Sequence, residues 1–139
     1  MKAPAPFIAL EEDLVLNLQF KKRGGLLPVA VQETTTGELL MLASVNQEAV
    51  QKSLETKKAT FFSTSRKELW TKGETSGDFL QLDAILVDCD QDALIYKVTL
   101  LGEGVCHTSN KDKKHRKACF YREINLENAT RLMFVKGRE

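Results

Sequence analysis

Apolar and polar residues alternate along several short stretches of the chain, which is the pattern of strands with one buried face. The turn sequence Thr34-Thr35-Thr36-Gly37 separates two of these stretches and predicts a hairpin. The predicted strands cover residues 14–20, 27–32, 38–43, 60–65, 84–90, 93–101 and 120–124. The pattern therefore predicts a protein that is mostly β.

The clearest helical pattern runs over residues 47–57. Asn46 precedes this segment and can cap its first turn through the side-chain oxygen, and Val50 and Leu54 share one face. The predicted fold class is α+β, mostly β, with twisted antiparallel sheets and one or two short helices. We expect residues 1–139 to form a single domain in which residues 1–6 are a loose tail.

Composition narrows the class of protein. A length of 139 residues suits one domain, and 42% hydrophobic with 28% charged residues is typical of a soluble globular protein. The net charge of +1 argues against a general nucleic-acid binder, which carries a marked basic excess. No apolar run approaches the roughly 18 residues that cross a bilayer, and residues 1–6 lack the apolar core of a signal peptide. We expect a cytoplasmic protein with no nucleic-acid or membrane partner.

The three cysteines raise the central chemical question. An odd number of cysteines in a reducing compartment argues against a closed disulfide framework. Cys89, Cys106 and Cys119 would supply the three protein ligands of a catalytic zinc site, which leaves one position open for water. None belongs to a C-x-x-C pair, so a structural zinc ribbon is not indicated. Three unrelated buried thiols remain an equal alternative.

The acidic sequence around Cys89 suggests a second metal. On a strand, Asp88 and Asp90 would point to one side and Cys89 to the other, while Asp92 in the following turn would return toward the two aspartates. Three neighbouring carboxylates repel one another unless a cation neutralises them, and a set of oxygen ligands suits Mg²⁺ or Ca²⁺. The alternative is a solvated hairpin tip with one buried cysteine.

The two histidines receive different interpretations. His107 follows Cys106 directly, so the two side chains are not expected to reach the same ion, and His107 is placed better as a proton shuttle. An ordinary histidine without a catalytic role is the alternative. His115 lies in the basic run over residues 111–117, which is most simply a solvated loop, with phosphate binding as the sharper alternative.

A polar stretch over residues 63–77 combines cationic side chains, hydroxyls, glycines and one tryptophan. Arginine and the backbone amides near glycine suit a phosphate, and an indole ring offers a stacking face for a base. The alternative is an ordinary polar loop with the tryptophan in the core. The candidate substrate-binding residues are Arg66, Trp70, Lys72, Glu74 and Ser76.

Four segments together resemble the phosphoribosyl-AMP cyclohydrolase family, and the resemblance extends over about residues 25–122. Each segment alone is a weak signal, but their joint presence in this order is highly specific. The segments are Leu-Trp-Thr-Lys-Gly-Glu-Thr-Ser-Gly at 69–77, Asp-Cys-Asp-Gln-Asp at 88–92, Cys-His-Thr at 106–108 and Cys-Phe-Tyr-Arg at 119–122.

The resemblance implies a hydrolase that opens the adenine ring of phosphoribosyl-AMP with a zinc-activated water. The product would be the phosphoribosyl-formimino-aminoimidazole carboxamide intermediate of histidine biosynthesis. The resemblance also implies an obligate homodimer whose zinc site takes cysteines from both subunits, with zinc at Cys89, Cys106 and Cys119. It implies Mg²⁺ at the three aspartates, Asp88, Asp90 and Asp92.

Two departures from the family pattern concern the site. The loop over residues 109–118, between the last two cysteines, is longer than is usual in the family, and Ser44-Val45-Asn46 stands where Tyr-Met-Asn is usual. Some relatives carry a second, pyrophosphohydrolase domain after the first. Because only 17 residues follow Arg122, the sequence leads us to expect no such domain.

Two rival functions differ in class. A zinc deaminase acting on purines would carry His-x-Glu and Pro-Cys-x-x-Cys patterns, and neither occurs in the chain. A non-catalytic zinc-dependent dimer would bind nucleotides or RNA through the basic loop. It would show salt-sensitive nucleic-acid binding and no ring opening.

Overall fold

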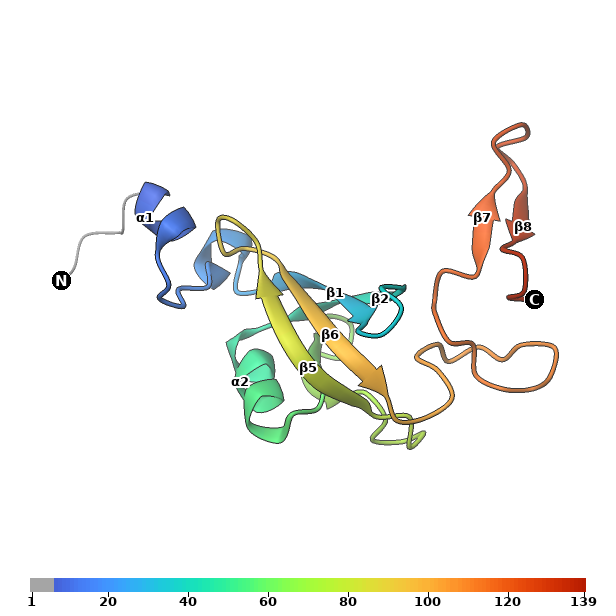
Figure 1. Cartoon of the computed structure of the whole chain (residues 1–139), viewed down its shortest axis with the longest axis horizontal. Coiled ribbons are helices and arrows are strands. Elements are labelled where there is room, and N and C mark those ends of the chain that lie inside the picture. Colours follow the sequence, from blue (N-terminus) through green and yellow to red (C-terminus); the bar gives the residue numbers. More distant parts are fainter. Residues whose placement is uncertain (1–6) are drawn as a thin grey trace.

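The computed structural model describes residues 7–139, with side chains from Leu10 onward. Residues 1–6, predicted to be a loose tail, lie outside the described residues. Figure 1 shows a sheet with a helix against it and a small hairpin at the C-terminal end of the chain. The elements in chain order are α1 (Phe7–Glu12), the 3-10 helix η1 (Phe20–Arg23), β1 (Leu27–Glu33), β2 (Leu39–Val45), α2 (Gln47–Thr56), β3 (Thr60–Ser63), β4 (Glu68–Thr71), β5 (Leu80–Val87), β6 (Leu94–Leu100), β7 (Arg122–Ile124) and β8 (Leu132–Phe134).

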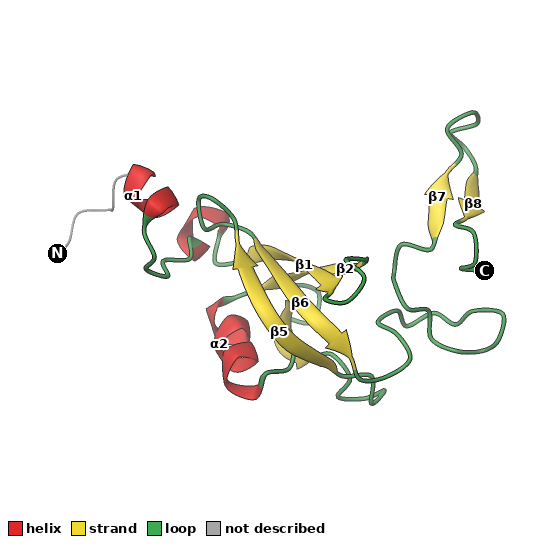
Figure 2. Ribbon diagram, in the orientation of Figure 1, coloured by secondary structure: helices red, strands yellow, loops and turns green. Residues whose placement is uncertain are grey.

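The central sheet has four strands in the order β2-β1-β6-β5, and β3–β4 and β7–β8 form separate two-stranded sheets (Figure 2). The pairs β1–β2 and β5–β6 are antiparallel, whereas β1 and β6 run parallel, with Val29 opposite Leu94. The prediction of mostly β structure is therefore confirmed, and antiparallel pairing is found in every hairpin of the described residues, whereas the parallel pair β1–β6, which was not predicted, makes the central sheet mixed. Local turns determine the two hairpins, whereas the parallel pairing joins residues far apart in the sequence.

One face of the central sheet forms the core together with α2 and the β3–β4 hairpin. Tyr96 and Phe61 are fully buried there, and their rings lie 5.7 Å apart, which is a favourable aromatic distance. Ser53 of α2 connects the helix to this core, because its hydroxyl accepts a hydrogen bond from the Thr60 amide (2.9 Å) and lies 3.2 Å from the Tyr96 hydroxyl. The buried polar groups are thus paired, as a stable core requires.

Local sequence signals determine the helix and the first hairpin as predicted. Asn46 caps α2 by accepting a hydrogen bond from the Ala49 amide at 2.8 Å, and the helix ends where Lys57 adopts a left-handed backbone (φ 59°). Gly37 takes φ 76° in the turn between β1 and β2, a conformation that glycine adopts without strain. Val50 is buried on the inner face, while Leu54 lies at its exposed edge.

The alternation over residues 14–20 does not form a strand. This segment is an irregular strap that ends in η1, and its backbone bonds to Gln91: the Asn17 amide donates to Gln91 Oε1 (2.7 Å) and the Gln19 amide to Gln91 O (2.8 Å). Since the Gln91 turn satisfies these amides, the strap needs no neighbouring strand. The sequence pattern also missed α1, β4 and β8, and it began β5 four residues late and extended it beyond Val87.

No helix among residues 7–139 is long and apolar enough to cross a membrane.

Candidate metal and substrate site

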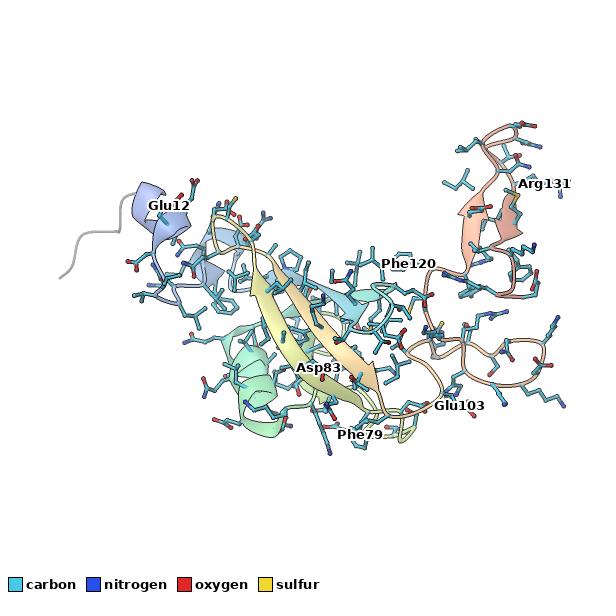
Figure 3. The ribbon with its side chains drawn as sticks, viewed as in Figure 1. Glu12, Phe79, Asp83, Glu103, Phe120 and Arg131 are labelled. Atoms are coloured by element: carbon cyan, nitrogen blue, oxygen red, sulfur yellow. The ribbon has the colours of Figure 1, made fainter. Side chains whose placement is uncertain are left out.

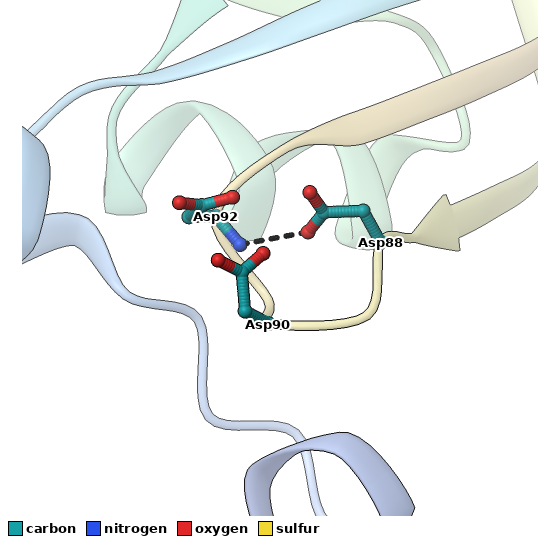
Figure 4. Close-up of side chains that lie close together, drawn as sticks. All are labelled: Asp88, Asp90 and Asp92. Carbon is teal, nitrogen blue, oxygen red and sulfur yellow. Dashed lines mark hydrogen bonds between the residues drawn. The ribbon is translucent and has the colours of Figure 1, made fainter. Parts of the chain in front are cut away.

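The three aspartates lie in the turn between β5 and β6, after the last strand residue, Val87. Their placement by strand alternation was therefore wrong, yet one carboxylate oxygen from each of Asp88, Asp90 and Asp92 lies within 4.8 Å of the others (Figure 4). Asp88 Oδ1 accepts hydrogen bonds from the Asp92 amide (2.9 Å) and the Ala93 amide (3.1 Å). The tight turn, not the pleat of a strand, brings the carboxylates together.

Two cations from η1 lie against this acidic turn, and no sequence motif predicted this contact. Lys22 Nζ is 3.0 Å from Asp90 Oδ2 and 2.9 Å from Asp92 Oδ2, and Arg23 Nη2 is 3.1 Å from Asp92 Oδ2. The hydrogen bond from Lys22 is the main reason why the pKa of the Asp92 carboxyl lies far below its ordinary value. The Lys22 side chain is half exposed.

Two of the three cysteines meet in the loops that follow β6. The Cys106 amide donates to Arg116 O (3.1 Å) and the Cys119 amide to Leu40 O (2.8 Å), so backbone bonds fix both residues. Burial, followed by the charge and hydrogen bond of Cys106, raises the pKa of the Cys119 thiol to about 11. The two sulfur atoms are thus near neighbours, and Cys106 Sγ also lies 2.9 Å from Thr108 Oγ1.

The third cysteine lies apart from this pair. Cys89 is exposed in the turn that precedes β6, whereas Cys106 follows β6, and a strand of this length extends about 20 Å. Across the part of the chain whose side chains are described, the acidic turn is the only group of three or more potential metal ligands. One copy of the chain therefore brings together two of the predicted zinc ligands and leaves the third at the other end of the sheet.

The predicted substrate-binding residues divide between two places. Lys72 follows β4 and lies close enough to Cys119 for its charge to oppose the rise in the pKa of that thiol. Glu74 is exposed in the same loop, and Ser76 Oγ accepts a hydrogen bond from the Asp78 amide (3.1 Å). Trp70 lies before them on β4, with its ring 4.8 Å from Phe61.

Arg66 lies at the other end of β4, in the turn of the β3–β4 hairpin, where Nη1 is 3.4 Å from Glu68 Oε1. It is exposed and is separated from Lys72 by the length of the four-residue strand, about 13 Å. A ligand that contacts both cations must therefore extend along the hairpin.

The two histidines differ in their surroundings. His107 is exposed directly after the buried Cys106. His115 is not simply part of a solvated loop: its Nδ1 lies 2.7 Å from Asp78 Oδ2. Together with a hydrogen bond from the Glu103 amide, the larger effect, His115 lowers the pKa of the Asp78 carboxyl. Asp78 lies 37 positions from His115, and no sequence motif joined the two.

An open pocket of about 910 Å³ lies elsewhere, between η1 and α2. Gly24, Asn46, Gln51 and Leu69 belong to its lining, which includes none of the predicted site residues. The volume of a pocket does not by itself identify a functional site, and this pocket lacks the chemical groups predicted for catalysis and metal binding.

Comparisons with known proteins agree with the resemblance seen in the sequence. A model of the phosphoribosyl-AMP cyclohydrolase family matches residues 41–121. The phosphoribosyl-AMP cyclohydrolase of Desulfatibacillum aliphaticivorans is 44% identical over 116 residues, which are 84% of this chain and 88% of the relative. That of Streptococcus mutans is 48% identical over 109 residues, 78% of this chain and 94% of the relative. The histidine biosynthesis bifunctional protein HisIE of Thermus thermophilus is 46% identical over 82% of this chain, which matches 50% of that protein.

Proposed function

Because the chain belongs to the phosphoribosyl-AMP cyclohydrolase family, we propose that it hydrolyses phosphoribosyl-AMP in histidine biosynthesis. Water adds to the adenine carbon that bears the amino group, and the bond from this carbon to the neighbouring ring nitrogen breaks. The ring opens to a carboxamide and a formimino group. The observation that carries the proposal is the family match over residues 41–121, which contains the acidic turn, both neighbouring cysteines and the Lys72 loop.

The donor set of the two neighbouring cysteines fits zinc. Two thiolates this close repel each other, and burial, followed by the neighbouring Cys106, raises the pKa of the Cys119 thiol to about 11. A soft dication removes the repulsion, and thiolates are ligands that Zn²⁺ prefers. Cys106 and Cys119 of one copy would hold the ion together with Cys89 of another. Bound zinc would lower the pKa of water from 15.7 toward about 7 and so make hydroxide available at neutral pH.

The outer face of the central sheet supports a homodimer. Leu42 faces Ala30, Ala30 also faces Ile95, and Ile95 faces Leu86, so one apolar row crosses all four strands. Leu42 and Leu86 are 64% and 45% exposed in the single chain. A second copy over this face would bury the row and is the proposed source of the third cysteine.

The oxygen ligands of the acidic turn fit Mg²⁺, which Asp88, Asp90 and Asp92 would hold. Bound there, the ion would neutralise the carboxylates and attract a substrate phosphate. Lys22 would leave Asp90 and Asp92 at the same time, since the carboxylates would no longer need its charge.

The remaining roles follow from position. His107, exposed beside Cys106, would take a proton from the attacking water and deliver it to the departing ring nitrogen. Lys72 and Ser76 would bind the nearer phosphate and Arg66 the more distant one, while Glu74 would accept hydrogen bonds from substrate hydroxyls. The Trp70 ring would contact the base.

The direct test supplies the purified full chain with phosphoribosyl-AMP, Zn²⁺ and Mg²⁺ and follows the ultraviolet change on ring opening. We expect turnover that a zinc chelator abolishes and added zinc restores. An absence of turnover by folded, zinc-loaded protein would overturn the proposed activity. Salt-sensitive binding of RNA without ring opening would favour the non-catalytic alternative instead.

Mixed dimers test whether the zinc site is shared. Cys89→Ala and Cys119→Ala chains, each inactive alone, are refolded together. Half of the random dimers are then mixed, and each mixed dimer has one intact site of two, so we expect about one quarter of the wild-type activity. Cys106→Ala mixed with Cys119→Ala is the matched control and should recover nothing, because both changes affect the same side of the site. Equal results for the two mixtures would contradict a shared site.

A further inference from the structure

Three loops that carry the proposed site meet at the carboxylate of Asp78. Asp78 Oδ1 accepts a hydrogen bond from the Glu103 amide (2.9 Å), and Asp78 Oδ2 lies 2.7 Å from His115 Nδ1. The Glu103 carboxylate in turn accepts the His115 amide at 3.0 Å. Asp78, Glu103 and His115 therefore form a closed network, in which each residue bonds to the other two. We call it the Asp78 network.

Two glycines allow the loops to approach this closely. A Cβ atom at Gly102 would lie 2.6 Å from Asp78 Cα, and one at Gly104 would lie 2.3 Å from Arg116 O. Both distances are too short for any side chain, so backbone packs directly on backbone at these crossings. The network lies in a tightly packed region where the Asp78 side chain is only 11% exposed. A hydrogen bond to a buried carboxylate is stronger than one at the open surface.

The position of each member along the chain relates the network to the site. Asp78 follows Ser76 by two residues, Glu103 precedes Cys106 by three, and His115 precedes Cys119 by four. Figure 3 shows Glu103 on the loop that leaves β6, beyond the strand end. The network thus joins the loop with Lys72 and Ser76 to the two segments that end in the thiols.

We propose that the Asp78–His115 pair is a positioning element, which holds the loop between the two neighbouring cysteines against the substrate-binding loop. The proposal rests on the proposed function and adds two residues to it. His115 acts through Asp78 and touches no reacting atom. Without the pair, residues 107–118 separate from the Lys72 loop, and the thiols and the phosphate-binding groups lose their common geometry.

The test compares His115→Ala with His115→Asn, whose amide nitrogen takes nearly the place of Nδ1 and can still donate to Asp78. In His115→Ala we expect zinc to transfer to a chelating dye about tenfold faster and the KM for phosphoribosyl-AMP to rise about tenfold, which is the ratio made by one charged hydrogen bond. The kcat should stay within about twofold at saturating zinc and substrate. In His115→Asn, the rate of zinc transfer and the KM should both return most of the way to the wild-type values.

Two further measurements separate positioning from general destabilisation. Trypsin should cleave after Lys111, Lys113 and Lys114 faster in His115→Ala, while the thermal midpoint of the sheet changes little. Lys114→Ala, an exposed change in the same loop, is the matched control and should leave zinc transfer and KM unchanged. Asp78→Ala combined with His115→Ala should be hardly worse than either change alone.

The outcomes distinguish this inference from the proposed function. Wild-type protein without zinc binding or turnover would overturn the proposed function, whereas the faster cleavage in His115→Ala would still stand. An active wild type, with a His115→Ala chain that matches it in zinc transfer, KM and cleavage, would overturn the positioning role alone. The positioning role would also be overturned if His115→Ala lowered kcat, raised KM and lowered the thermal midpoint together, and His115→Asn restored none of them.

Discussion

The sheet body over residues 27–100 buries its large apolar side chains to a greater extent than the C-terminal segment over residues 101–139 does. In the body, Phe61, Leu40 and Tyr96 are fully buried. In the C-terminal segment, Leu126 is 92% exposed and Phe134 is 47% exposed, and Figure 1 shows the β7–β8 hairpin standing away from the sheet. The body closes a core of its own, whereas the segment that carries Cys106 and Cys119 does not.

Charged contacts connect the C-terminal segment to the body. Lys117 Nζ lies 2.7 Å from Glu33 Oε1, and Arg138 Nη2 lies 2.7 Å from Glu38 Oε1. Lys117 Nζ also lies 2.9 Å from Glu38 Oε2, so one lysine contacts two carboxylates of the body. Such partly exposed links contribute little each, so most of the free energy of unfolding resides in the body, while two of the three proposed zinc ligands lie in the less stable C-terminal segment. This division is the claim that the following predictions address.

The largest difference in the free energy of unfolding is expected between two phenylalanine substitutions, one in the body and one in the C-terminal segment. Phe61→Ala removes a fully buried ring and should lower the free energy of unfolding by about 3–5 kcal/mol. Phe134→Ala removes the same group from the hairpin and should cost less than about 1 kcal/mol. Urea denaturation of both variants at low protein concentration measures the two values.

The dependence on protein concentration distinguishes the Phe61→Ala and Phe134→Ala variants further. If a second copy covers the hairpin, the cost of Phe134→Ala will grow as the protein concentration rises, while that of Phe61→Ala will not. Equal costs at every concentration would remove the distinction between the two regions.

Alkaline pH should affect the body through Tyr96. Burial raises the pKa of its hydroxyl from 10.0 to about 12. The folded state therefore favours the neutral phenol: the stabilisation is complete below pH 10 and is lost as the pH rises through 12. The free energy of unfolding should fall by about 2–3 kcal/mol through this ionisation.

Urea titrations from pH 9 to 12 of the wild type and Tyr96→Phe isolate this effect. The difference between the two curves should narrow as the pH rises, because the phenylalanine cannot ionise. A constant difference across this range would show that the Tyr96 hydroxyl titrates alike in the folded and unfolded chains.

The sequence predicted well those features that local signals control. Asn46, the apolar face with Val50, and the Thr34–Gly37 turn each act within a few residues, and α2 and the β1–β2 hairpin formed as expected. The alternation at Leu14 failed because a strand also needs a neighbour, and Gln91 supplied the hydrogen bonds instead. The parallel pairing of β1 with β6 depends on distant segments and had no local signal.

The sequence predicted which residues belong to the candidate site but not how they lie relative to one another. The aspartates come together through a tight turn in which Gln91 adopts φ 57°, a conformation that alternation did not foresee. The separation of Cys89 from the other cysteines follows from the length and direction of β6, which spacing in the sequence does not encode. Lys22 and Asp78 carried no motif, since their partners, Asp90 and His115, are distant in the sequence.

A smaller effect is expected from two asparagines whose side chains accept backbone hydrogen bonds, one in each region. Asn46 caps α2 in the body, whereas Asn125 Oδ1 accepts amides of Glu127 (2.9 Å) and Asn128 (3.2 Å) in the β7–β8 turn. Asn46→Ala should lower the global free energy of unfolding by about 1 kcal/mol. Asn125→Ala should leave that value unchanged and instead speed amide hydrogen exchange in β7 and β8, because the hairpin opens without the body. Faster exchange in the body of Asn125→Ala would show that the two regions unfold together.

The smallest effect concerns the acidic turn between β5 and β6, where charged contacts replace the apolar packing of the body. Lys22→Met keeps the length of the side chain and removes the ammonium that lies 3.0 Å from Asp90 and 2.9 Å from Asp92. Since Mg²⁺ must displace this ammonium, we expect the Kd for Mg²⁺, measured by titration calorimetry, to fall about two- to fivefold. Lys21→Met is the matched control, because Lys21 is an exposed neighbour in the same helix. Weaker binding in Lys22→Met would mean that the lysine orients the carboxylates for the ion and does not compete with it.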